Sequence, residues 1–239
     1  MSTTPPSLAV VTGAAGGIGA ALAKALQARG ARLVLADIDS DALDRVAART
    51  GSSAVPTDVA DPDAVEALAG RTEGASLVCL NAGVVGTDLG APWEVSARDW
   101  NRVFDVNVGG VVNGLRAFVP RLLAVGRPAH VLVTASLAGL TVFPGGGAYG
   151  PSKHAVVAVV EHAAMALAGT PVTISMICPA LVATGMSSDG VAPESVAAQA
   201  LDALDAGIFA VVPAEWRAAV VREVDEVASG CVPTPPAPS

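Results

Sequence analysis

The sequence has 239 residues, of which 52% are hydrophobic and 15% charged, a composition that suits one α/β domain with a sizeable core and excludes a disordered chain. The net charge of −8 argues against nucleic acid or an anionic membrane surface as a partner. There is no long apolar run typical of a membrane-spanning helix, and "MSTTPPS" lacks the charged and apolar regions of a signal peptide.

Short apolar runs alternate along the chain with longer helical patterns, such as the one over 17–30 that ends at Gly30. The runs are almost continuously apolar, which is typical of strands covered on both faces of a parallel sheet. We expect about seven strands, at 8–13, 31–37, 53–58, 76–83, 129–136, 172–179 and 207–213.

Regular alternation of strand and helix predicts a doubly wound parallel sheet with helices on both faces, which is a single Rossmann-type α/β domain. We assign residues 8–230 to this domain. The segments 1–7 and 231–239 are rich in Pro, Ser and Thr, so we expect both to be disordered tails.

A glycine-rich turn, "TGAAGGIG" at 12–19, joins the first strand to the first helix. Glycines at 13, 17 and 19 permit a sharp turn and let backbone N–H groups approach a pyrophosphate at the helix N-terminus. No Lys-Ser or Lys-Thr follows, so this is not a nucleoside-triphosphate loop. Its position favours a dinucleotide site, with a turn that only packs helix on strand as the alternative.

Acidic and amide residues end the next strands. Asp37 can accept hydrogen bonds from adenosine ribose hydroxyls and would repel a 2′-phosphate. The alternative is an N-cap for the helix that begins near Ser40, although Asp39 could supply that cap equally well. Asp58 and Asn81 close the third and fourth strands, so these side chains gather at one edge of the sheet.

Tyr149, the only tyrosine, and Lys153, one of two lysines, are four residues apart in "YGPSK" and share one helix face. An ammonium close to a phenol stabilises the phenolate and lowers a pKa that is otherwise about 10. Ser136 ends the preceding strand, and Asn107 interrupts an apolar helical pattern. Each has an alternative interpretation when taken singly. Tyr149 and Lys153 could be a chance polar pair, Ser136 a turn residue and Asn107 a helix-bending side chain.

In this order the motifs resemble the short-chain dehydrogenase/reductase family, over roughly residues 8–186. The resemblance implies that Tyr149 is the general acid/base and that Lys153 binds the nicotinamide ribose and lowers the tyrosine pKa. It implies that Ser136 orients the substrate oxygen and that Asn107 holds a water of a proton relay. The resemblance rests on 12–19, Asp58-Val59, 81–83, Asn107, Ser136 and 149–153.

The same resemblance implies which residues contact the cofactor, from pyrophosphate through adenosine to nicotinamide. In this order they are Gly13, Gly17, Ile18 and Gly19, then Asp37, Asp58, Val59, Asn81, Ala82 and Gly83, and finally Tyr149, Lys153, Pro179, Val182 and Thr184. The chain departs from the family pattern at Leu80, where an asparagine is common, and at Ala180, where a glycine is common. The lid segment after Thr184 is also short.

These observations predict an NAD-dependent oxidoreductase that interconverts a secondary alcohol and a ketone. The flanking residues Val84, Val85, Leu137, Phe143 and Leu181 are apolar, so we expect a hydrophobic substrate. One alternative is an NADPH-dependent carbonyl reductase, but the charge of Asp37 argues against it. Another is a non-catalytic dinucleotide-sensing or scaffold protein, but such a protein would not need Asn107, Ser136, Tyr149 and Lys153 together.

Expectations about assembly and location complete the sequence-based hypothesis. The apolar helices at 99–124 and 149–168 predict a homodimer or homotetramer. Cys79, Cys178 and Cys231 are odd in number and lack metal-ligand spacing, so we expect reduced thiols, no metal and a cytoplasmic protein. The three histidines also lack a metal-like arrangement.

Overall fold

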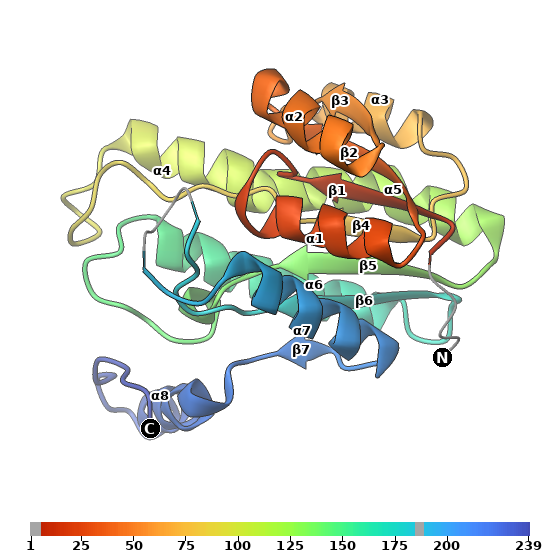
Figure 1. Cartoon of the computed structure of the whole chain (residues 1–239). Coiled ribbons are helices and arrows are strands. Elements are labelled where there is room, and N and C mark those ends of the chain that lie inside the picture. Colours follow the sequence, from red (N-terminus) through yellow and green to blue (C-terminus); the bar gives the residue numbers. More distant parts are fainter. Residues whose placement is uncertain (1–5, 185–188) are drawn as a thin grey trace.

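The computed structural model describes residues 6–184 and 189–239. Its strands form one seven-stranded parallel sheet in the order β3-β2-β1-β4-β5-β6-β7 (Figure 1). The order reverses between β1 and β4, so the predicted doubly wound parallel sheet is confirmed. The strands are β1 Leu8–Thr12, β2 Arg32–Asp37, β3 Ser53–Pro56, β4 Leu77–Leu80, β5 Ala129–Thr134, β6 Val172–Ile177 and β7 Ala210–Val211.

The sheet separates two hydrophobic cores, which explains the continuous apolar runs. In β1, Ala9 and Val11 face one core and Val10 faces the other, because successive side chains of a strand point to opposite faces. In β4, likewise, Leu77 and Cys79 face the first core and Val78 the second. Both faces are covered, so apolar residues occupy nearly every position of these strands, with Thr12 at the end of β1 as the exception.

Helices α1, α2 and α7 contribute to the first core, and α3, α5 and α6 to the second (Figure 1). α1 ends within two residues of the predicted Gly30, which has a φ of 85°. The helices are α1 Gly17–Ala28, α2 Ser40–Thr50, α3 Pro62–Gly70, α4 Ala97–Phe104, α5 Gly110–Val125, α6 Tyr149–Ala166, α7 Pro193–Asp205 and α8 Arg217–Ala228.

The predicted helix over 99–124 is interrupted. A π-helical turn, Asp105–Gly109, lies between α4 and α5. By length and composition alone, the whole segment Ala97–Val125 could span a membrane, a property that the core helix of a soluble protein shares. Here α5 packs against α3, and α4 against α6. The expectation that no membrane is a partner stays a prediction.

After β7 the chain leaves the layered body and forms α8, which lies to one side near the C-terminus (Figure 1). The last residues turn back onto this helix: the Thr234 N–H donates to Glu226 at 2.8 Å, and the Ser239 N–H donates to the Glu215 carbonyl at 2.9 Å. Disorder of 231–239 stays a prediction, and most of the expected N-terminal tail, residues 1–5, lies outside the described residues.

Candidate active site

Asn81 joins three strands at their carboxyl ends. Its Nδ2 donates to the carbonyl oxygens of Thr12 and Gly13 at 3.1 and 3.2 Å, and its Oδ1 accepts from Thr134 Oγ1 at 2.9 Å. The Thr12 Oγ1 also accepts from the Asn81 N–H at 3.0 Å. These bonds fix the ends of β1, β4 and β5 relative to one another, so the edge of the sheet is a rigid platform.

The glycine loop packs against α1 with no room for side chains. A Cβ at Gly19 would lie 2.0 Å from the Gly13 carbonyl oxygen, and one at Gly13, whose φ is 65°, would lie 2.7 Å from the Ala82 Cα. By contrast, apart from Gly16 itself and its two neighbours in the chain, no heavy atom of the described residues lies within 4 Å of a Cβ placed at Gly16. The loop is therefore closed towards the protein and open outside, a cradle that fits a pyrophosphate.

Asp37 does not cap the second helix. Asp39 accepts from the Ala42 N–H at 3.0 Å and is the N-cap of α2. The two Asp37 carboxylate oxygens accept from the Ala15 and Asp39 N–H groups at 2.9 and 3.1 Å. Each oxygen can accept further hydrogen bonds, so Asp37 is tied to the glycine loop with acceptor capacity left for a ligand hydroxyl.

Asp58 and Val59 follow β3 and are held by backbone contacts. Asp58 Oδ1 accepts from the Ala60 N–H at 2.9 Å, and the Val59 carbonyl accepts from Asn113 Nδ2 at 3.0 Å. Val59 is buried, and a Cβ at Gly110 of α5 would lie 2.8 Å from its side chain. Val59 therefore has a fixed position between β3 and α5, next to Asp58, which follows the end of β3.

The predicted catalytic residues come from two successive elements. Ser136 follows β5 and accepts from the Ala138 N–H at 3.1 Å, while Tyr149 begins α6. An interaction of the Ser136 side chain with Tyr149 lowers the pKa of the tyrosine, against the effect of burial. Lys153, one turn later, places Nζ 5.7 Å from the centre of the tyrosine ring and donates to the Thr134 carbonyl at 3.0 Å.

The pKa values of this pair shift with burial. Burial raises the pKa of Tyr149, and an interaction with the Ser136 side chain opposes this rise. Burial also lowers the pKa of Lys153 to about 8, and its Nζ donates to the Thr134 carbonyl. The expectation that Lys153 lowers the tyrosine pKa stays a prediction.

Asn107 lies in the π-helical turn and is 1% exposed. Its Oδ1 accepts from the Val84 N–H at 2.8 Å, and its Nδ2 donates to the Val84 carbonyl at 3.0 Å and to Ser152 Oγ at 2.9 Å. A Cβ at Gly83 would lie 3.2 Å from Asn107 Oδ1 and 3.4 Å from Lys153 Nζ. The amide thus connects the segment after β4 to α6 beside Lys153.

A family model described as short chain dehydrogenase matches residues 7–194. The chain belongs to the short-chain dehydrogenase family.

Named relatives agree with this assignment. The chain is 46% identical over 200 residues to the 1-deoxy-11-beta-hydroxypentalenate dehydrogenase of Streptomyces avermitilis, covering 80% of this chain and 74% of the relative. It is 45% identical over 199 residues to the enzyme of the same name from Streptomyces arenae, covering 77% and 70%. A short-chain dehydrogenase/reductase from Burkholderia phymatum, solved in complex with NAD, has a TM-score of 0.93 at 33% identity over the full length of both chains.

In this short-chain dehydrogenase, the segment after β6 meets the glycine loop. A Cβ at Gly17 would lie 3.0 Å from the Thr184 methyl group. The Pro179 carbonyl accepts from the Leu137 N–H at 2.9 Å, and Val182 pairs with Val191 in an isolated bridge. Much of the expected lid, residues 185–188, lies outside the described residues.

Sequence reasoning missed three hydroxyl residues that hold the site of this short-chain dehydrogenase. Thr12 and Thr134 fix Asn81, and Ser152 bonds to Asn107. Thr12 and Thr134 are the polar residues that end the apolar strands β1 and β5. A polar residue at the end of an apolar strand could have indicated both threonines. Ser152 lies within the motif 149–153, in which only Tyr149 and Lys153 were given a role.

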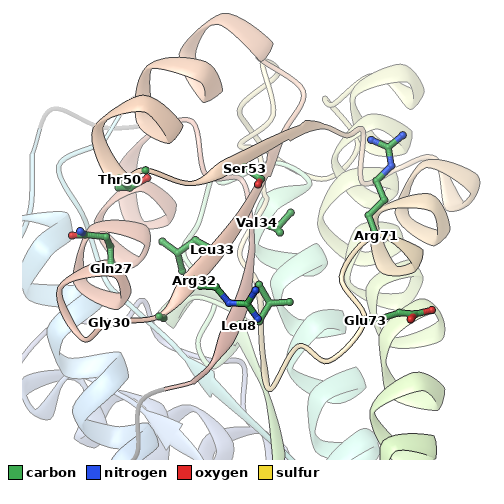
Figure 2. Close-up of a pocket in the computed structure, with 12 residues that line it drawn as sticks. Leu8, Gln27, Gly30, Arg32, Leu33, Val34, Thr50, Ser53, Arg71 and Glu73 are labelled. Atoms are coloured by element: carbon green, nitrogen blue, oxygen red, sulfur yellow. The ribbon is translucent and has the colours of Figure 1, made fainter.

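A hollow of about 600 Å³ opens at the amino ends of the first strands, beside Leu8, Arg32 and Ser53 (Figure 2). The candidate active site lies instead at the carboxyl ends of the strands, around Asn81. The two regions are therefore at opposite ends of the sheet, and the hollow in Figure 2 is no part of the candidate active site.

Proposed function

We propose that this short-chain dehydrogenase uses NAD(H) to interconvert a secondary alcohol and a ketone. The observation that carries the proposal is the placement of Ser136 after β5 and of Tyr149 at the start of α6, with Lys153 Nζ 5.7 Å from the centre of the tyrosine ring, at the same edge of the sheet as the glycine cradle. Dehydrogenase relatives support an oxidoreductase. A bound nicotinamide would supply hydride chemistry, and the protein would supply orientation and proton management.

In this proposal Tyr149 exchanges the proton of the substrate oxygen and Ser136 orients that oxygen. Because burial raises the pKa of Tyr149, the side chain is a neutral phenol at neutral pH and is ready to donate a proton to a ketone oxygen. In the alcohol-oxidising direction the same side chain must first lose its proton, which requires a compensating positive charge. Lys153 is the nearest candidate, at 5.7 Å from the ring centre.

The proposed cofactor is NAD rather than NADP. The Asp37 carboxylate would accept bonds from the ribose hydroxyls and repel a 2′-phosphate, and neither Gly16 nor the exposed Ile38 is basic. Like-charge contacts of this kind cost several kcal/mol, so we expect kcat/KM to favour NAD at least about a hundredfold. The solved NAD complex of the Burkholderia phymatum relative is consistent with this choice. Comparable efficiency with NADP would contradict the role given to Asp37.

The proposed substrate is apolar. Among the five flanking residues, Phe143 and Leu181 expose 36% and 65% of their surface, and Val84 and Val85 are half-buried. Leu137 differs because it is 2% exposed, so it packs beneath the site rather than lining it. Exposed apolar side chains at this edge of the sheet suit the hydrocarbon part of a hydrophobic secondary alcohol.

The proposed assembly is a homodimer or homotetramer through the segments 99–124 and 149–168. Part of the outer face of α6 is apolar, with Met165 70% exposed, and an apolar face on a surface helix commonly meets a partner. Sedimentation at micromolar concentration tests this proposal, and a monomer alone would contradict it.

The decisive experiment follows the ultraviolet absorbance of reduced nicotinamide with a panel of secondary alcohols and ketones. We expect turnover by the wild type and a loss of about 10²- to 10⁴-fold in Tyr149→Phe, with NAD affinity by calorimetry nearly unchanged. Lys153→Arg should lower both turnover and NAD affinity, because a planar guanidinium is a poor substitute for a compact ammonium. A wild type that binds NAD without turning over any of the panel would instead favour a dinucleotide-sensing protein.

A further inference from the structure

A buried carboxylate outside the proposed catalytic set contacts the loop beside it. Glu223, in α8, is 8% exposed, and its Oε2 accepts hydrogen bonds from Thr141 Oγ1 and, at 2.8 Å, from the Val142 N–H. No arginine, lysine or histidine among the described residues forms an ion pair with it. Its polar contacts are therefore with this one loop, 81 residues earlier in the chain.

The loop that Glu223 holds is the connection between Ser136 and Tyr149, which we call the substrate loop (137–148). Thr141 is fully buried, and its N–H donates to the Leu137 carbonyl at 3.1 Å. At the other end, the Gly145 carbonyl accepts from the Gly90 N–H at 3.0 Å, in the loop that follows β4. The substrate loop is thus held at two points, by Glu223 and by the segment after β4.

Between these two points the loop presents apolar side chains. Val142 is 52% exposed, and Phe143 is 36% exposed and packs edge-on against Trp216, with ring centres 5.6 Å apart at an angle of 64°. Trp216 immediately precedes α8. The C-terminal segment therefore contacts the loop twice, through Glu223 and through Trp216, which places a second restraint on Phe143.

The C-terminal segment lies beyond the part of the chain that the family model describes. The model ends at residue 194, whereas Trp216 and Glu223 come later. The family model therefore says nothing of the contact between α8 and the substrate loop, which connects Ser136 to Tyr149.

We propose that Glu223 is a positioning residue that sets substrate preference by fixing Val142 and Phe143 at the rim of the active site. The inference rests on the proposed alcohol dehydrogenase function. Without the carboxylate, the Thr141 hydroxyl loses its acceptor in a buried place, and the Val142 N–H loses its acceptor in a partly buried one. Buried donors are rarely left unpaired, so the loop would move to reach water and would carry the apolar rim with it.

The test compares Glu223→Ala, Glu223→Gln and Glu226→Ala in the full-length protein. The glutamine side chain would retain a carbonyl oxygen able to accept both bonds. Glu226 is the matched control, because it lies in the same helix and holds Thr234 of the tail rather than the substrate loop. The kinetic readout is the ratio of kcat/KM for borneol to that for cyclohexanol, a bulky and a small secondary alcohol.

We expect Glu223→Ala to change this ratio at least about tenfold, mainly through KM, as misplaced pocket contacts do. Glu223→Gln should restore it to within about threefold, and Glu226→Ala should leave it unchanged. If Glu223→Ala does not fold, Thr141→Val, which removes one of the two bonds, should shift the ratio in the same direction. An unchanged ratio in the folded variants would overturn the proposal.

Hydrogen exchange of the peptide covering 137–148 supplies a readout that needs no turnover. Exchange should be faster in Glu223→Ala than in the wild type and in Glu226→Ala, because the Val142 N–H has lost its acceptor. Equal exchange in all three would refute the positioning role. A wild type that oxidises neither alcohol nor any other of the panel would refute the proposed function, while the exchange result would still decide whether Glu223 fixes the loop.

Discussion

The glycine loop and the substrate loop lie at the same edge of the sheet, but they are held in different ways. In the glycine loop, Gly19 lies directly against the Gly13 carbonyl, and the loop is also bonded to Asn81 and Asp37. The substrate loop is held by a distant side chain, Glu223, and by one backbone bond, from the Gly90 N–H to the Gly145 carbonyl. A close backbone contact restricts a position to glycine, whereas a distant side-chain contact places little restriction on the loop itself. The positions in close backbone contact, which include Gly139 of the substrate loop, therefore tolerate few residue types, whereas the exposed Val142 and Phe143 are freer to differ.

The largest effect should come from the glycine loop. Gly19→Ala would place a methyl group 2.0 Å from the Gly13 oxygen, so we expect a loss of about 3 kcal/mol or more in the free energy of unfolding and loss of NAD binding. Gly16→Ala is the control, because Gly16 has extended backbone and open space, and should change stability by less than about 0.5 kcal/mol. Denaturant unfolding and calorimetry measure both. Equal stability of the two variants would contradict the backbone-contact argument.

A partly buried histidine in β5 makes the stability of the fold sensitive to acid. His130 of β5 bonds through Nδ1 to Thr173 Oγ1 and through Nε2 to Ser175 Oγ, both at 2.7 Å, and burial lowers its pKa to about 4. Between this value and the unfolded value of about 6.5, the unfolded chain binds a proton that the folded chain does not. The free energy of unfolding should therefore fall by up to about 3 kcal/mol as the pH drops from about 6.5 to about 4.

His130→Gln should remove this part of the pH dependence. Urea unfolding at several pH values measures the slope, with His162→Gln as the control because His162 is exposed on α6. If His130→Gln and the wild type lost stability equally over this range, the acid sensitivity would come from other groups.

A smaller effect should follow from Ser152, which bonds α6 to the π-helical turn. Ser152→Ala would leave one Asn107 N–H without its acceptor in a buried place. We expect a loss of about 2 kcal/mol in stability and a lower kcat with little change in NAD affinity. Ser195→Ala, at an exposed position near the start of α7, is the control and should be almost neutral. Full activity and stability in Ser152→Ala would show that Asn107 does not depend on this bond.

The smallest effect should come from the ion pairs between Arg29, at the C-terminal end of α1, and α7. Arg29 contacts Asp202 at 3.2 Å and Asp205 at 2.9 Å, all near the surface. Arg29→Met should cost no more than about 1 kcal/mol, and added salt should reduce the difference from wild type. A larger loss that is independent of salt would mean that packing of the arginine stem, rather than charge, joins the two helices.

The same contrast explains what the sequence could predict. The strands could be predicted because both faces of each are buried, and the glycine loop because its spacing is restricted locally. From the sequence, either Asp37 or Asp39 could cap the second helix. The structure shows that Asp39 is the cap, because its side chain accepts from the Ala42 N–H. The partners of Asn107 and Glu223 could not be predicted, since each bond joins residues at least 23 positions apart. No local pattern marks such a pair.

The π-helical turn at Asp105–Gly109 has a consequence for the chain's tolerance of insertions and deletions. A π turn holds one more residue than an α turn, and each residue of a regular helix advances the direction of the side chains by about 100°. Deleting one residue from this turn would let α4 and α5 merge into one regular helix, but it would rotate one of them relative to the other by that angle. Either Asn107 would lose Val84 and Ser152, or the apolar face of α5 would leave the core. The length of this segment is therefore under stricter constraint than the identity of most of its residues, and a single deletion there should be more harmful than any single substitution of a neighbouring exposed residue.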